Sequence, residues 1–174
     1  MFRKLVVALV AALTMASAAV PEANAWSFTD RLRSSRATDA SAPLAFQLFC
    51  LKHPSECRRS KRAVVTYTPK IRALLVSVNA QVNRSIKPRR KRGDTWTINP
   101  AYGDCDDYAM TKRHRLIRAG IPASALKIAV VRTRRGEGHA VLIVKTTAGD
   151  FALDNIRKTI VRRHQTGYRF EKLV

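Results

Sequence analysis

The chain has 174 residues, and its 33 Lys and Arg against 12 Asp and Glu give a net charge of +21 at pH 7. This length suits a single domain with its own hydrophobic core, and no segment after the N-terminus has the roughly 20 apolar residues of a membrane-spanning helix. A charge this large favours an anionic partner, such as nucleic acid, phospholipid head groups, cell-surface polysaccharide or an acidic protein. A merely solvated basic surface is the plain alternative.

The first 25 residues have the pattern of an export signal. Arg3 and Lys4 precede an uncharged apolar run from Leu5 to Ala19, and Ala23-Asn24-Ala25 supplies the small residues of a cleavage site. The apolar run has about 15 residues, which is short for a membrane anchor. We therefore predict a signal peptide over residues 1–25 and a periplasmic or secreted bacterial protein of 149 residues with a net charge of +20.

Residues 26–43 are polar and predict a flexible N-terminal arm before one domain over residues 44–174. Leu44 to Cys50 is a short apolar segment that predicts a helical turn. Because three cysteines in an oxidising compartment leave one unpaired, we predict a local disulfide between Cys50 and Cys57. A zinc site of Cys50, His53 and Cys57 is the alternative, and it lacks an obvious fourth ligand.

The next segments predict a helix followed by a basic loop. Apolar residues recur at three- and four-residue spacing from Pro69 to Arg84, which is typical of an amphipathic helix covering a core. The run from Lys87 to Gly93 has no interleaved aromatic residue, so it predicts an exposed, solvated basic loop. Asp94 to Tyr102, which contains Trp96, predicts an irregular approach to the next helix.

A lone cysteine opens the next predicted helix. Asp104 is a good N-cap residue, and the helical pattern continues to Gly120, with Pro122 just beyond. Cys105 would therefore occupy the first helical turn, where the helix dipole and free N–H groups favour a thiolate. The aspartates beside it oppose a thiolate, so the site needs a compensating imidazolium, a bound cation, or both.

After this helix the pattern changes to short strands. Leu126 to Thr133 and His139 to Thr147 are rich in β-branched residues, and Phe151 to Asp154 follows a hairpin turn. Residues 156–174 predict one or two further strands. The chain therefore predicts an α+β domain, with N-terminal helices followed by an antiparallel meander.

Three residues form a candidate catalytic set. A thiol enzyme needs a nucleophile, a base for its proton and a group that orients the base. Cys105 opens a helix, His139 opens a strand, and Asp154 ends the neighbouring strand of a hairpin, where the two strand ends meet. Taken singly, each also has an ordinary structural interpretation: a buried thiol, a strand-end histidine and a turn aspartate.

The motif Gly103-Asp104-Cys105-Asp106-Asp107-Tyr108-Ala109, with His139 and Leu153-Asp154-Asn155 downstream, resembles the bacterial transglutaminase-like cysteine proteinases. The resemblance runs from about Ile71 to Phe170. It implies a papain/transglutaminase-like fold and a Cys-His-Asp triad made of Cys105, His139 and Asp154. The best-known member cleaves a giant surface adhesin and releases cells from biofilms, so a surface protein is the implied substrate.

The resemblance also implies calcium, held by Asp104 and Asp106. The family pattern has Glu where this chain has Asp106, and capping of the helix by these acids is an interpretation that needs no metal. The function predicted is a peptidase that hydrolyses peptide bonds, with transfer to an amine as the alternative reaction. Its rivals are a non-catalytic basic binding module of the same fold and a charge-driven binder of nucleic acid or membrane.

Overall fold

The structure is a computed structural model that describes residues 42–174. The predicted signal peptide and nearly all of the predicted arm therefore lie outside the described residues. Within the described range, no helix is both long enough and apolar enough to cross a bilayer.

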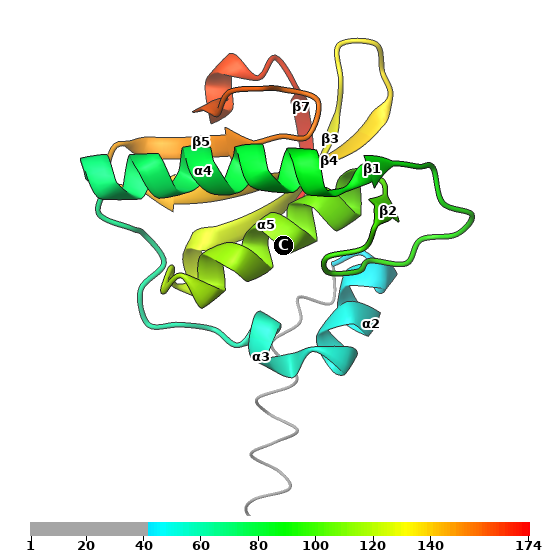
Figure 1. The fold of residues 1–174 in the computed structure, drawn as a ribbon, viewed down its shortest axis with the longest axis horizontal. Coiled ribbons are helices and arrows are strands. Elements are labelled where there is room, and N and C mark those ends of the chain that lie inside the picture. Colours follow the sequence, from blue (N-terminus) through cyan, green and yellow to red (C-terminus); the bar gives the residue numbers. More distant parts are fainter. Residues whose placement is uncertain (1–41) are drawn as a thin grey trace, which may run out of the picture.

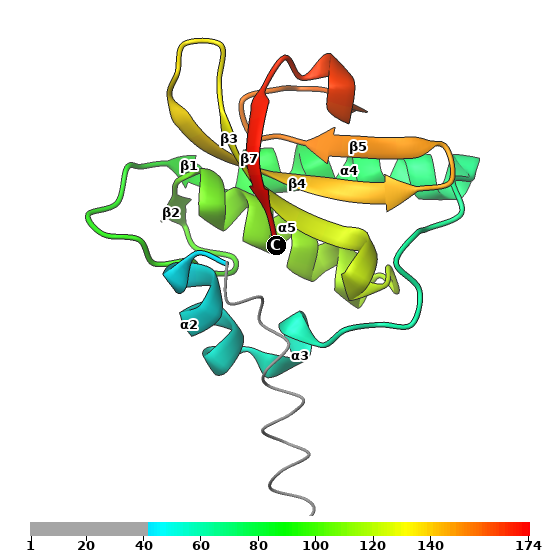
Figure 2. The ribbon, with the colours of Figure 1, turned by 180° about the vertical axis from the view of Figure 1, so that it is seen from behind.

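A five-stranded antiparallel sheet forms the centre of the domain, with the strand order β6-β5-β4-β3-β7 (Figures 1 and 2). The long central strands are β-branched and almost fully buried, because helices cover one of their faces and the C-terminal segment covers the other. The strands are β3 (Leu126–Arg132), β4 (Gly138–Thr146), β5 (Gly149–Leu153), β6 (Val161–Arg162) and β7 (Arg169–Leu173).

The two longest helices lie on one face of this sheet, and the two short N-terminal helices lie beside them (Figures 1 and 2). Thr68 caps the longest of them by accepting the Ile71 N–H, and a proline occupies its first turn. The helices are α2 (Leu44–Lys52), α3 (Pro54–Cys57), α4 (Pro69–Ser85) and α5 (Cys105–Arg118), with 3₁₀ turns η1 (Ala123–Ala125) and η2 (Arg163–Gln165). The predicted α+β class, with helices packed on an antiparallel sheet, is confirmed.

The main core lies between α4, α5 and the inner face of the sheet. Leu75, Val82 and Met110 are fully buried there and pack with Leu142 and Leu153 of the central strands. Because α5 packs directly on β4, its first turn is held close to the beginning of that strand. This packing determines where Cys105 lies relative to His139.

The last strand departs from the predicted meander. β7 pairs with β3, on the opposite edge of the sheet from β6, so the chain crosses the outer face before it ends. Tyr168 and Phe170 on this crossing segment pack on a second cluster that contains Val131, Val141 and Ile143. The crossing carries Tyr168 to the ends of β4 and β5.

Cys50 and Cys57 form a disulfide, as predicted, with their Cα atoms 5.6 Å apart. Both sulfurs are therefore committed to each other, and the ring of His53 lies against Phe49 instead of joining a zinc site. Glu56 of α3, next to Cys57, accepts a hydrogen bond from Nδ1 of His114 at 2.7 Å. The disulfide segment is thus attached to the side of α5.

The basic run after α4 is more ordered than predicted. Lys87–Pro88 forms a short strand, β1, that pairs in parallel with β2 (Tyr102–Gly103) just before α5. Arg89 lies over the ring of Tyr102, with its guanidinium carbon 4.0 Å from the ring centroid. Lys91 folds back toward the first turn of α5, so this residue at least is not simply solvated.

Candidate active site

The first turn of α5 is held by a capping box. The side chain of Asp104 accepts from the Asp107 backbone, and Oδ2 of Asp107 accepts the Asp104 N–H at 3.2 Å. Gly103 is needed for this close approach, because a Cβ at that position would lie 2.5 Å from Oδ2 of Asp107. The predicted N-cap is therefore present, and Asp107 completes it.

Cys105 is the free thiol of the described chain and is half-buried at the first position of α5. Burial, followed by the charge of Asp106, raises its pKa to about 12, although the Ala140 backbone N–H donates to the sulfur and works in the opposite direction. The sulfur therefore lies beside the residue that follows His139. The thiol makes a long contact of 3.9 Å with Oδ1 of Asp106, and within residues 42–174 it has no hydrogen bond to an imidazole.

His139 and Asp154 are in direct contact. Nε2 of His139 donates to Oδ1 of Asp154 at 2.9 Å, and the Asp154 side chain is fully buried. The pairing of β4 with β5 produces this contact, because the beginning of one strand lies beside the end of the other. With Nε2 committed to the carboxylate, Nδ1 is the ring atom left to exchange a proton with a thiol.

Further donors hold the Asp154 carboxylate. The Ile156 N–H donates to Oδ1 at 3.1 Å, the Tyr168 hydroxyl donates to Oδ2 at 2.6 Å, and Nε of Arg157 lies 3.7 Å from Oδ2. Burial alone would raise the pKa of Asp154, but the hydrogen bonds from His139 and Tyr168 outweigh it and the pKa is lowered. Asp154 is therefore ionised at neutral pH.

Tyr168 was not predicted as part of this site. Besides its bond to Asp154, its ring meets the His139 ring edge-on, with centroids 5.7 Å apart and planes at 81°. In the sequence it is one aromatic residue in a short C-terminal strand pattern, 14 residues from Asp154. No local motif marks it, because the chain crossing brings it to the site.

A group of acids lies on the other side of Cys105. Burial, followed by the charges of Asp104 and Asp94, raises the pKa of Asp106 to about 6. Oδ1 of Asp104 is buried and accepts no hydrogen bond. It forms an ion pair with the ammonium of Lys91, at a distance of 3.3 Å. The same ammonium lies 2.8 Å from Oδ1 of Asp107.

These residues do not fit a calcium ion as they are arranged. Calcium takes six to eight oxygen ligands, and both oxygens of Asp107 already accept protein donors. Lys91 already places a positive charge beside Asp104, and residues 42–174 contain no group of three or more Asp, Glu, His or Cys arranged to hold a metal. Calcium bound by Asp104 and Asp106 stays a prediction from the family resemblance, without support from this geometry.

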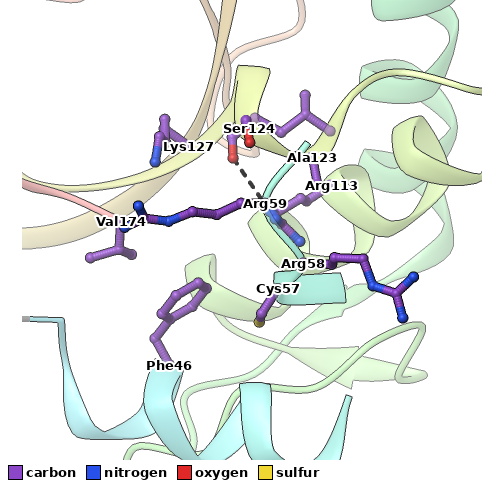
Figure 3. Close-up of a pocket in the computed structure, with 10 residues that line it drawn as sticks. Phe46, Cys57, Arg58, Arg59, Arg113, Ala123, Ser124, Lys127 and Val174 are labelled. Atoms are coloured by element: carbon purple, nitrogen blue, oxygen red, sulfur yellow. Dashed lines mark hydrogen bonds between the residues drawn. The ribbon is translucent and has the colours of Figure 1, made fainter. Parts of the chain in front are cut away.

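The small pocket in Figure 3 is separate from this site. It has a volume of about 100 Å³ and lies between the disulfide segment and the beginning of β3, with Phe46, Arg59 and Ser124 in its wall. A larger open groove of about 580 Å³ is lined by Arg157 and Tyr168, the two residues whose side chains approach Oδ2 of Asp154. Cys105, His139 and Asp154 line neither of these two cavities, so the larger one meets the candidate site through Arg157 and Tyr168.

A family profile described as bacterial transglutaminase-like cysteine proteinase matches residues 36–173. The chain belongs to this family. It is therefore a transglutaminase-like cysteine peptidase, as the motif around Cys105 predicted. A comparison with curated proteins finds no match.

The proteinase also resembles solved structures of LapG from Legionella pneumophila. The calcium-bound form has a TM-score of 0.55 and 17% identity, over 84% of this chain and 82% of LapG. A second LapG structure has a TM-score of 0.54 and 18% identity over the same shares, and an EGTA-treated form has a TM-score of 0.52 and 17% identity over 82% and 78%. At such identities the likeness establishes the shared fold.

We predict that Tyr168→Phe slows the proteinase, because Asp154 and His139 are then held less firmly in position. The change keeps the ring against His139 and removes the donor to Asp154, so kcat should fall about 10-fold with little change in KM, as for loss of a hydrogen bond to a charged group. The pKa of Asp154 should rise, which moves the acid limb of the kcat/KM profile to higher pH.

The matched control for this change is Tyr67→Phe, since Tyr67 stacks on Phe151 and belongs to neither the predicted triad nor its contacts. The control should retain the wild-type kcat and pH profile. A Tyr168→Phe enzyme with both parameters unchanged would show that the hydroxyl has no positioning role.

Proposed function

We propose that this peptidase is exported and hydrolyses a peptide bond in a periplasmic or surface protein, with Cys105 as nucleophile, His139 as base and Asp154 as the orienting group. The observation that supports this most strongly is the buried carboxylate of Asp154, which holds Nε2 of His139 at 2.9 Å. A fixed imidazole with its other nitrogen available is what a thiol needs for activation.

In the proposed mechanism, Nδ1 of His139 takes the Cys105 proton and the thiolate attacks the substrate carbonyl. Because the pKa of Cys105 is raised by burial, a thiolate forms readily only as an ion pair with the imidazolium. The imidazolium then protonates the leaving amine, and the acyl-enzyme reacts with water. An amine in place of water would give amide transfer instead.

Free N–H groups at the beginning of α5 supply the proposed oxyanion stabilisation. Cys105 is the first residue of the helix, so its own N–H is not used within the helix and can face the developing oxyanion. Asp154 keeps its charge through the cycle, because its hydrogen bonds hold its pKa low. No step of this mechanism uses a metal.

The proposed substrate is a protein, and a surface adhesin is the candidate that the family resemblance supplies. The groove beside Tyr168 carries Arg134, Arg135 and Arg157 and one acid, Glu137, so an acidic segment of the substrate is favoured there. The same basic character suits an anionic surface or polymer near the substrate. Export rests on the predicted signal peptide, which lies outside the described residues.

The test is a comparison of exported proteins from cells with the wild-type enzyme and cells with Cys105→Ala. We expect new protein N-termini in the wild-type sample alone, which N-terminal peptide profiling by mass spectrometry would detect. A matched strain carrying Lys70→Met, at an exposed helix position, controls for expression and charge.

Identical N-termini in all three strains would contradict proteolysis and favour the non-catalytic binding module. In that case Cys105→Ala should still bind an acidic polymer such as polyglutamate, with an affinity that falls steeply with salt.

A further inference from the structure

One lysine of the basic run is turned into the acid group beside Cys105. The ammonium of Lys91 lies 2.8 Å from Oδ1 of Asp107 and 3.3 Å from Oδ1 of Asp104, and it also donates to the Thr95 carbonyl oxygen. Its side chain is only 20% exposed, although it belongs to a loop of otherwise exposed residues. A cation surrounded by two carboxylates and a carbonyl has the surroundings of a bound metal ion.

The acids around Lys91 are concentrated in an otherwise basic protein. Only 12 of the 174 residues are acidic, and four of them, Asp94, Asp104, Asp106 and Asp107, meet in this one place. Asp107 is completely buried, and a buried carboxylate is costly unless a positive charge and hydrogen bonds compensate it. Some cation must therefore accompany this group.

Lys91 supplies that cation from within the chain. Oδ1 of Asp107 accepts from Lys91 and from both donors of Thr97, and Oδ1 of Asp94 accepts the Trp96 indole N–H at 2.8 Å. The loop between β1 and β2 is thereby tied to the first turn of α5. Both oxygens of Asp107 and Oδ1 of Asp94 and of Asp104 are engaged by groups of the chain itself.

We propose that the Lys91 ammonium is the built-in counter-ion of these acids, so that the first turn of α5 is held in place without a bound divalent cation. The relevant contrast is with LapG, for which both calcium-bound and EGTA-treated structures exist. From its position in the loop, Lys91 places a positive charge against Asp104 and Asp107, as a bound cation would. This inference concerns binding and stability, so it stands whether or not Cys105 is catalytic.

The experiment compares wild type, Lys91→Met and the control Lys70→Met after chelation with EGTA. Each is titrated with calcium chloride to about 1 mM, where extracellular calcium modules become occupied, while the melting temperature is measured. Terbium, a calcium analogue, is added in parallel, since Trp96 lies at the acid group and can sensitise its luminescence.

We expect no calcium-dependent melting shift and no sensitised terbium signal for wild type or Lys70→Met. Lys91→Met should melt about 5 °C lower in EGTA, because a buried carboxylate loses its counter-ion, and calcium should restore most of the loss. It should also acquire a terbium signal.

Two results would overturn the proposal. The first is stoichiometric calcium binding by wild type with a rise in its melting temperature, a measurement that needs no variant to fold. The second is a folded Lys91→Met that keeps wild-type stability or gains no response to calcium or terbium.

Discussion

Replacing Cys105 with alanine is expected to lower peptide hydrolysis by at least about 10⁴-fold while the protein stays folded. The thiol belongs to no disulfide and only partly fills the core, so its loss removes the proposed nucleophile and little packing. Circular dichroism and the melting temperature should match wild type, and kcat measured on a protein substrate should disappear. Measurable turnover by Cys105→Ala would remove this residue from the mechanism.

Alkylation with iodoacetamide measures the activation of the same thiol without a substrate. Burial raises the pKa of this thiol to about 12, so without an imidazolium partner it should react slowly at pH 7. Pairing with the imidazolium should make wild type react much faster than His139→Ala. Equal rates in the two proteins would show that the histidine does not activate the sulfur.

Replacing Asp154 with alanine is expected to produce the second large effect, on both activity and stability. The change leaves the donors of His139, Tyr168 and Ile156 without their buried acceptor, and kcat should fall about 10²–10³-fold. The free energy of unfolding should decrease by about 3 kcal/mol, because several buried donors lose the acceptor they share. Steady-state kinetics and urea unfolding measure the two effects.

Asp154→Asn separates two contributions of this side chain: its hydrogen bond to His139, which orients the ring, and its negative charge. It keeps an oxygen that can accept from His139 but removes the negative charge, so its kcat should lie between those of wild type and Asp154→Ala. Because the pKa of Asp154 is lowered in the fold, its charge stabilises the protein above the ordinary pKa of 3.8, and the stabilisation is lost as pH falls through the lowered value. The stability difference between wild type and Asp154→Asn should therefore shrink in acid.

The parts of the site that depend on local order were predictable from the sequence. A capping aspartate before an amphipathic pattern indicates a helix start, and this pattern correctly predicted that Cys105 lies in the first helical turn. A hairpin turn between two short strands makes the beginning of one adjacent to the end of the next, which brings His139 to Asp154. The short spacing between Cys50 and Cys57 likewise limited the disulfide to one pairing once Cys105 was assigned elsewhere.

Contacts between distant segments were not predictable in this way. The sequence gives no sign that β7 crosses to the far side of β3, and Tyr168 reaches Asp154 only because of that crossing. Lys91 was interpreted as one member of a solvated basic run, since its neighbours carry the same charge and nothing local distinguishes it. Its role depends on the pairing of β1 with β2, which turns the loop toward α5.

Taken alone, the sequence determined the chemistry that this protein carries: a thiol at a helix start, an imidazole and a carboxylate on neighbouring strands, and a disulfide. Residue type and short-range periodicity are sufficient for these features, because turns, caps and hairpins are local. The tertiary structure decided which groups surround that chemistry, namely the tyrosine that donates to the Asp154 carboxylate and the lysine that pairs with Asp104 and Asp107. The positions of these two residues depend on pairing between strands that are distant in the sequence and on burial. Both arise only when the whole chain has packed.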